Sequence, residues 1–180
     1  MEIRIANNQA DAESASKIHA LGWKSGYRGI FSDKLLDSIP LHFWTEHFNR
    51  THETRQLALC RVDGEDIGAV TYGLSRDYPD KNAGEIWSFY FLEKTWGKGY
   101  AVPFMHFIVE QLQSKDCAVL YLWTLNDNIR AQRFYEKCYF RRTGNEKACT
   151  FQGETKMQIE FIFTKEDECQ VEQKSELSEM

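Results

Sequence analysis

The chain has 180 residues, of which 42% are hydrophobic, and a formal net charge of −5 at neutral pH. This length suits one domain, and the hydrophobic content is sufficient for a core. No apolar run approaches the ~18–20 residues of a membrane span, and the start Met-Glu-Ile-Arg-Ile lacks the basic and apolar blocks of a signal peptide. We therefore expect no membrane partner, and the negative charge argues against a nucleic acid partner.

The cysteines indicate a reducing environment. They are odd in number, widely spaced and without a Cys-x-x-Cys pair, which argues against a disulfide framework and against a zinc knuckle. We expect free thiols, no bound metal and a cytoplasmic location. The cysteines are Cys60, Cys117, Cys138, Cys149 and Cys169.

The first half of the chain predicts strands and helices in mixed order. Apolar residues recur at helical spacing after a short alternating strand, and two apolar runs flank a tight turn at Asp63-Gly64. The predicted elements are a strand at Glu2–Ala6, helices at Ala10–Trp23, Asp33–Ile39 and Phe43–Phe48, and hairpin strands at Gln56–Val62 and Ile67–Leu74.

The second half continues the mixed pattern. Its predicted elements are strands at Ala83–Leu92, Val119–Thr124, Phe140–Thr150 and Lys156–Phe163, a helix at Tyr100–Lys115 and a further capped helix before Phe140. Residues 164–180 contain six acidic residues and two lysines with little apolar content, which is typical of a solvated tail. We expect one domain over residues 1–163, followed by this acidic tail.

A glycine-rich turn lies between the strand that ends at Leu92 and the next helix. Gly97 and Gly99 permit a tight bend and close approach of a ligand, with Lys98 between them. The free N–H groups at the start of the helix would form an anion site, so the turn favours a phosphorylated ligand. The alternative is an ordinary glycine-rich connection with a solvated lysine.

Two nucleotide-binding motifs do not fit this turn. A phosphate-binding loop of the Gly-x-x-x-x-Gly-Lys type requires glycine where Leu92 stands, and serine or threonine where Gly99 stands. A dinucleotide fingerprint requires a small third residue where Val102 stands. These mismatches argue against a nucleotide-binding interaction domain.

A second motif about 25 residues later completes a recognisable pair. The segment Asn128-x-x-Ala131-x-x-Phe-Tyr-Glu-Lys-Cys-Tyr-Phe140 follows an apolar strand, and the earlier turn reads Trp96-x-x-Gly99-x-Ala101. Together they resemble the two central motifs of the GNAT superfamily of acetyl-CoA-dependent N-acetyltransferases. The resemblance covers about residues 1–163, with its specific part at 85–140. It departs from the family pattern at Trp96, where glutamine or arginine is usual, and at Tyr139, where glycine is usual.

The resemblance implies a fold, a cosubstrate and an activity. The fold is a mixed α/β domain with a central, mostly antiparallel, twisted sheet of six to seven strands flanked by helices. Acetyl-CoA would bind mainly to backbone N–H groups, and its acetyl group would pass directly to a primary amine of a small molecule, protein or peptide in a ternary complex. The residues implied for binding are Gly97, Lys98, Gly99, Tyr100 and Ala101.

The departures alter the expected turn geometry. Trp96 removes a side-chain donor to the pyrophosphate, and Lys98 can supply the charge instead. Since Tyr139 lacks the freedom of glycine to form a left-handed cap, we expect a different turn after the second motif.

Five residues are candidates for the chemical step and its support. Glu85 would take the proton of the amine, directly or through water, with Glu93 next in line; the alternative for Glu85 is an exposed glutamate at a strand end. A backbone N–H near Phe91 would stabilise the thioester oxygen. The resemblance places Tyr135 as the acid for the leaving thiolate, and the alternative is packing within its helix. Asn128 would cap that helix and bind the pantetheine arm.

The first half of the chain contains a candidate acceptor pocket. A set of aromatic side chains lies where the resembled family builds its acceptor pocket, although such a set is also typical of a core. His19 and His106 lie in predicted helices as surface or packed residues. A non-catalytic acyl-CoA-binding module remains the alternative function. The aromatic set is Trp23, Tyr27, Phe31, Phe43, Trp44 and Phe48.

Overall fold

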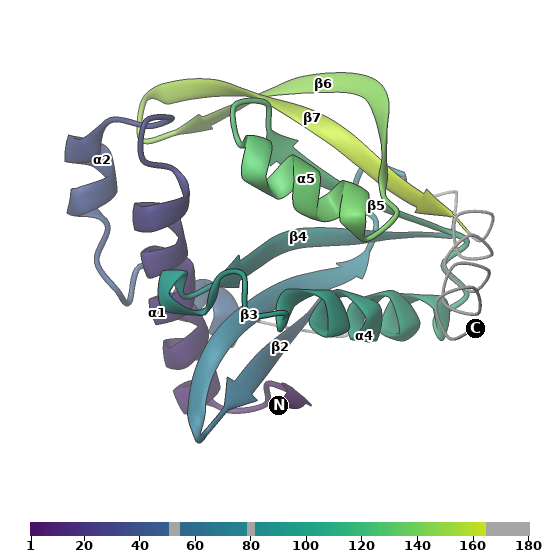
Figure 1. Cartoon of the computed structure of the whole chain (residues 1–180), viewed down its shortest axis with the longest axis horizontal. Helices are drawn as coiled ribbons and strands as arrows, with labels where there is room; N and C mark the ends of the chain where they lie inside the picture. Colours follow the sequence, from purple (N-terminus) through teal and green to yellow (C-terminus); the bar gives the residue numbers. More distant parts are fainter. Residues whose placement is uncertain (51–54, 79–81, 165–180) are drawn as a thin grey trace. The chain divides into compact units, whose positions relative to one another are not determined.

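A computed structural model describes residues 1–50, 55–78 and 82–164 and confirms the mixed α/β fold (Figure 1). Its seven strands form one mostly antiparallel sheet in the order β1-β2-β3-β4-β5-β7-β6. The expected six to seven strands are therefore confirmed. The predicted acidic tail lies outside the described residues beyond Thr164.

The chain divides into two compact units, and the division falls within β4 (Ala83–Phe91) and within α4 (Ala101–Gln113). The first unit comprises residues 1–73 and 86–108, and the second comprises residues 74–85 together with the chain from 109 onward. Each unit contains some of the candidate site residues predicted from the sequence.

The first unit contains the predicted N-terminal helices and hairpin. Its elements are β1 (Glu2–Ile5), α1 (Gln9–Gly26), α2 (Asp33–Ser38), α3 (Thr45–Asn49), β2 (Arg55–Val62), nearly all of β3 (Glu65–Leu74) and the 3-10 helix η1 (Glu93–Thr95). Asn8 begins α1 by accepting a hydrogen bond from the Asp11 N–H, and Ser32 caps α2 in the same way through Leu35.

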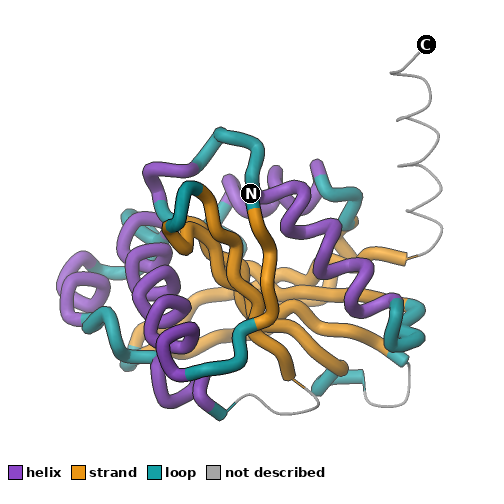
Figure 2. Tube along the Cα trace, turned by 90° about the horizontal axis from the view of Figure 1, so that it is seen from below, coloured by secondary structure: helices purple, strands orange, loops and turns teal. Residues whose placement is uncertain are grey.

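The hairpin of the first unit forms at the predicted turn. Asp63 and Gly64 both have positive φ, at 50° and 80°, which suits the tight turn between antiparallel strands. β2 pairs with β1 on one side and β3 on the other. Figure 2 draws the strands in orange, and the first of them begins at the N-terminus. This pairing places Gln56 directly opposite Tyr72.

The second unit is built around β7. Its elements are β5 (Val119–Leu125), α5 (Ile129–Lys137), β6 (Arg141–Phe151) and β7 (Glu154–Thr164). β7 pairs antiparallel with both β5 and β6, and the turn between β6 and β7 places Gln152 and Gly153 at positive φ. The β6–β7 register shifts between Arg142 and Glu146, which marks a bulge in β6.

The turn after α5 differs from the sequence-based expectation. Tyr139 has φ of 63°, the left-handed conformation that a glycine would adopt at this place, so the prediction of a different turn was wrong. The Phe140 N–H donates to the Tyr135 carbonyl at 3.0 Å, and the Tyr139 N–H donates to the Glu136 carbonyl at 3.0 Å. These bonds and the burial of Phe140 hold a tyrosine in a conformation that costs it energy.

Candidate functional site

The glycine turn has the geometry of an open anion site. Gly97 and Gly99 have φ of 74° and 86°, and a Cβ at either position would meet no atom within 4 Å. Within the described residues, the N–H groups of Gly97, Gly99, Tyr100 and Ala101 donate to no other backbone group. α4 begins at Ala101, so these donors gather at the positive end of its dipole.

Two aromatic residues hold the turn to its strand. The Trp96 indole N–H donates to the Phe91 carbonyl at 3.0 Å, so the residue that departs from the family pattern closes the turn. The Phe91 ring packs against Phe89 and Phe104, with centroids 5.6 and 5.7 Å away. Lys98 is exposed, and its side chain contacts no partner in the described chain, so its charge is available to a ligand.

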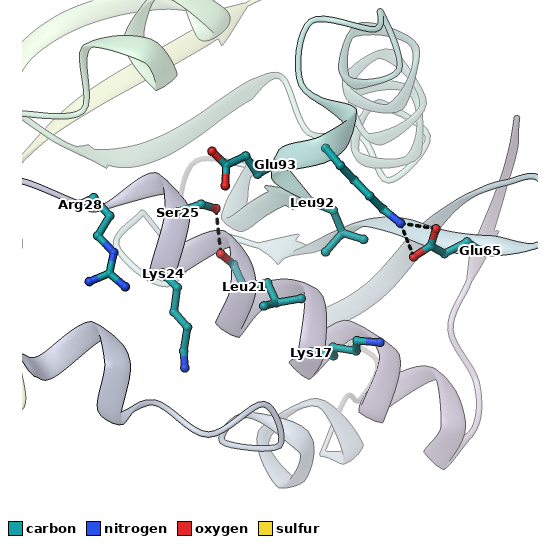
Figure 3. Close-up of a pocket in the computed structure, with 9 residues that line it drawn as sticks. Lys17, Leu21, Lys24, Ser25, Arg28, Glu65, Leu92 and Glu93 are labelled. Atoms are coloured by element: carbon teal, nitrogen blue, oxygen red, sulfur yellow. Dashed lines mark hydrogen bonds and ion pairs between the residues drawn. The ribbon is translucent and has the colours of Figure 1, made fainter. Parts of the chain in front are cut away.

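An open groove of about 760 Å³ lies beside α1 and the segment that follows β4 (Figure 3). Most of its charges already have partners: Arg28 pairs with Asp33 and Asp37, and the Lys94 ammonium lies 2.7 Å from a Glu65 oxygen. The Glu93 carboxylate has no hydrogen-bond partner in the described chain and lines this groove. The groove thus presents one available carboxylate in the first unit.

Glu85 is buried in the second unit and carries an ion pair, so the alternative of an exposed strand-end glutamate was wrong. Its side chain is 2% exposed. Arg76 donates to both oxygens, at 2.6 and 3.0 Å, and the Tyr121 hydroxyl donates to Oε2 at 2.8 Å. The bond to Glu85 raises the pKa of the Arg76 guanidinium, whereas burial chiefly raises the pKa of Tyr121.

Glu85 and Tyr135 lie on opposite faces of the strands of the second unit. Tyr121, which bonds Glu85, is directly opposite Ile162 in the β5–β7 register. Neighbouring residues on a strand point to opposite faces, so Phe161 points away from Tyr121. The Tyr135 ring lies 5.9 Å from that of Phe161. A base at Glu85 and an acid at Tyr135 would therefore act from opposite faces of these strands.

α5 carries the two remaining candidates. The Asn128 Oδ1 accepts a hydrogen bond from the Ala131 N–H at 3.2 Å, which confirms the predicted cap. Its amide Nδ2 has no partner in the part of the chain described, so that donor is available to a ligand. Tyr135 is 8% exposed, and the Phe140 and Phe161 rings flank it, whereas Ile129 is exposed.

A second buried carboxylate, Glu160, was missed by the sequence analysis. It is 1% exposed and accepts hydrogen bonds of 2.8 Å from Tyr78, Thr143 and Asn145. The β6 bulge supplies two of these donors. A signal was present, because a glutamate between Ile159 and Phe161 interrupts an apolar strand and needs partners.

The aromatic residues of the first unit gather around His19. Trp23, Trp44, Phe48 and Tyr90 surround its ring, and Phe43 stays 42% exposed. The predicted cluster therefore forms, and it includes a histidine and a β4 tyrosine that the sequence analysis had not placed in it.

Neither a metal site nor a membrane segment was found in the described ranges. No three His, Cys, Asp or Glu side chains come together there in a way that could hold an ion. No helix in those ranges is both long and apolar enough to cross a bilayer.

Comparisons with known proteins find relatives that are named acetyltransferases. One curated relative, the spermine/spermidine N(1)-acetyltransferase of Bacillus subtilis, is 29% identical over 99 residues, which are 53% of this chain and 63% of the relative. The match thus spans less than two thirds of that protein.

Solved structures share the fold at low identity. The PaiA N-acetyltransferase of Thermoplasma acidophilum, in complex with coenzyme A, has a TM-score of 0.68 at 17% identity and covers 89% of this chain and 98% of its own. The ribosomal-protein-alanine N-acetyltransferase of Brucella melitensis has a TM-score of 0.67 at 16% identity, covering 91% and 99%. The sequence pattern of the acetyltransferase (GNAT) family matches residues 13–140. With both motifs inside that range, the chain belongs to the acetyltransferase (GNAT) family of enzymes.

Proposed function

We propose that this protein transfers an acetyl group from acetyl-CoA to a primary amine. The observation that carries the proposal is the turn at 97–101, where two left-handed glycines and N–H groups with no backbone acceptor among the described residues adjoin the start of α4. Such a turn suits a pyrophosphate. The coenzyme A complex of a structural neighbour and the family membership support acetyl-CoA as the ligand.

The binding residues have separate tasks in this proposal. The N–H groups of Gly97, Gly99, Tyr100 and Ala101 bind the pyrophosphate, and the Lys98 ammonium adds charge. The Asn128 amide donates to the pantetheine arm with the nitrogen that its cap leaves available. A backbone N–H near Phe91 binds the thioester oxygen as negative charge develops there.

The chemical step needs one base and one acid. The amine nitrogen forms a bond to the acetyl carbon while the carbon–sulfur bond breaks, without an acyl-enzyme. Glu85 takes the proton from the amine, directly or through water, and the Tyr135 hydroxyl donates a proton to the thiolate. Arg76 and Tyr121 already bond the Glu85 carboxylate, so proton transfer to Glu85 has to compete with both hydrogen bonds.

The relative from Bacillus subtilis suggests where to look for the acceptor. Its name specifies spermine and spermidine, so we propose a polyamine as the first acceptor to test, ahead of small monoamines and protein amines. A cytoplasmic location suits this reaction, and the free cysteines Cys60, Cys117, Cys138 and Cys149 support it.

A thiol-release assay over an amine panel tests the activity. Tyr135→Phe should lower kcat on the order of 10²-fold while acetyl-CoA affinity, measured by calorimetry, changes little because the ring remains. Tyr139→Phe serves as the control, since it removes a nearby hydroxyl without a proposed role. Coenzyme A binding without thiol release from any amine would favour the alternative, a non-catalytic acyl-CoA-binding module.

A glycine pair tests the cosubstrate site. Gly99→Val should abolish acetyl-CoA binding in calorimetry, because the side chain forces the turn out of its left-handed conformation and obstructs the anion. Gly153→Val is a matched control, since Gly153 has the same φ of 86° and the same open surroundings in the β6–β7 turn. Equal binding by both variants would place the cosubstrate elsewhere.

A further inference from the structure

His19 is a buried histidine whose ring is enclosed by aromatic side chains of the first unit. It lies in α1 and is 8% exposed. Its ring centroid is 4.1 Å from that of Trp44 and 4.3 Å from that of Tyr90. Phe48 and Trp23 lie further out, at 5.6 and 6.3 Å. These five residues form the His19 cluster.

Gly22 allows α1 and β4 to approach each other closely beside His19. Gly22 follows His19 by one helical turn, and a Cβ there would lie 2.7 Å from Tyr90 Cδ1, so only glycine admits the tyrosine ring. The Tyr90 hydroxyl shares a 2.8 Å hydrogen bond with the Tyr27 hydroxyl. Tyr90 is thereby fixed beside the imidazole and bonds to a residue other than His19.

The imidazole has no hydrogen-bond partner among the described residues, and its burial favours the neutral form. Burial, followed by the charge of His47, lowers the pKa of His19 to about 3. Neither ring nitrogen forms a hydrogen bond within the described ranges of the chain. A neutral imidazole offers one N–H and one acceptor nitrogen, so an approaching donor would find a free acceptor.

The aromatic rings around His19 favour an alkylammonium group as the hydrogen-bond donor. The faces of Trp and Tyr rings attract alkylammonium groups, and Trp23, Trp44 and Tyr90 are each only partly buried. A protonated histidine would repel such a group, whereas a neutral one accepts its N–H. We propose that His19 accepts a hydrogen bond from a nitrogen of the amine acceptor, and that the rings of the His19 cluster bind its alkylammonium body. This inference rests on the proposed acetyltransferase function and specifies a cationic alkylamine as its substrate class.

The test uses His19→Phe, with His106→Phe as the control. Phenylalanine keeps the ring but removes the acceptor, and His106 is an exposed histidine on α4. For His19→Phe we expect the KM for spermidine to rise about tenfold, with kcat and acetyl-CoA affinity unchanged and Tm equal or higher. His19→Gln, whose amide oxygen still accepts, should recover part of the loss. An unchanged KM for every amine, or a joint loss of Tm and acetyl-CoA affinity, overturns the proposal.

A measurement without turnover separates this inference from the proposed function. In ¹⁵N-labelled protein without acetyl-CoA, spermidine should shift the imidazole nitrogen resonances of His19 and leave those of His106 in place. This shift would support the inference even if no amine released thiol. Saturation with spermidine that leaves the His19 resonances unmoved would contradict it, even if the enzyme proved active.

Discussion

Two fully buried tyrosines, one in each unit, differ in what their hydroxyl groups contact. The Tyr121 hydroxyl donates to Glu85 at 2.8 Å, lies 3.0 Å from the Ser75 hydroxyl and accepts the Asp77 N–H at 3.3 Å. The Tyr72 hydroxyl has no hydrogen-bond partner among the described residues, and burial raises its pKa to about 12. The same side chain is therefore satisfied in one region and unsatisfied in the other.

The difference extends to the neighbours of each tyrosine. Near Tyr121, the carboxylates Glu85 and Glu160 accept hydrogen bonds at both oxygens. Across the strand from Tyr72, the Gln56 Oε1 is buried without a partner among the described residues. A saturated network holds its own strands together, whereas unpaired groups lower stability unless a ligand pairs with them.

The largest expected effect tests whether the saturated Glu85 nonetheless takes part in the reaction. Glu85→Gln should lower activity by on the order of 10²-fold at neutral pH, with partial recovery at high pH, where the amine deprotonates unaided. Arg76→Met keeps the carboxylate but removes the cation that pairs with it, so its activity should stay closer to that of the parent than the activity of Glu85→Gln. Arg142→Met, which breaks an exposed pair with Glu146, is the control.

A purely structural Glu85 would respond differently. Both Glu85→Gln and Arg76→Met would then lose stability together, and their remaining activity would follow the pH profile of the parent. In that case another group takes the proton, and Glu93 in the groove beside η1 is the next carboxylate to substitute.

The sequence predicted the elements of this chain well because its signals are local. The hairpin at Asp63-Gly64, the cap at Asn128 and the glycine turn each depend on residues within a few positions of one another. The partners of Glu85 and Glu160 were not predictable in this way. Tyr121 and Tyr78 come from segments 36 and 82 residues away, so only the folded strands bring them together.

Tyr139 shows a different failure, in which tertiary structure overrides local preference. Left-handed φ is costly for tyrosine, so the sequence argued for another turn. The bonds around the end of α5 and the buried ring of Phe140 nevertheless enforce the glycine-like conformation. Likewise, helical spacing predicted only that His19 is either a surface residue or a packed residue. Its neutral, unpaired state depends on rings from α1, α3, β4 and the residue before α3.

The second-largest expected effect is the pH dependence of stability that His19 causes in the first unit. The His19 pKa is about 3 in the folded chain and 6.5 for a histidine fully exposed to water, so the unfolded state binds more protons between these values. Stability should therefore fall on acidification through this window, by roughly 2 kcal/mol between pH 7 and pH 5. His19→Phe should lose this part of the slope in denaturant titrations. Parallel slopes would mean that His19 is protonated when folded.

The smallest effect tests the comparison of the two tyrosines directly, with one chemical change made twice. Tyr121→Phe removes a donor to a buried carboxylate and should lower the free energy of unfolding by about 1.5 kcal/mol. Tyr72→Phe removes a hydroxyl that has no partner in the described part of the chain, so the free energy of unfolding should stay constant or rise by about 0.5–1 kcal/mol. Urea titrations at pH 7 without ligand measure both, and equal m-values would show that only stability changed. A loss at Tyr72 as large as at Tyr121 would show that its hydroxyl is paired in solution, for example by a buried water, and the contrast between the two regions would not hold.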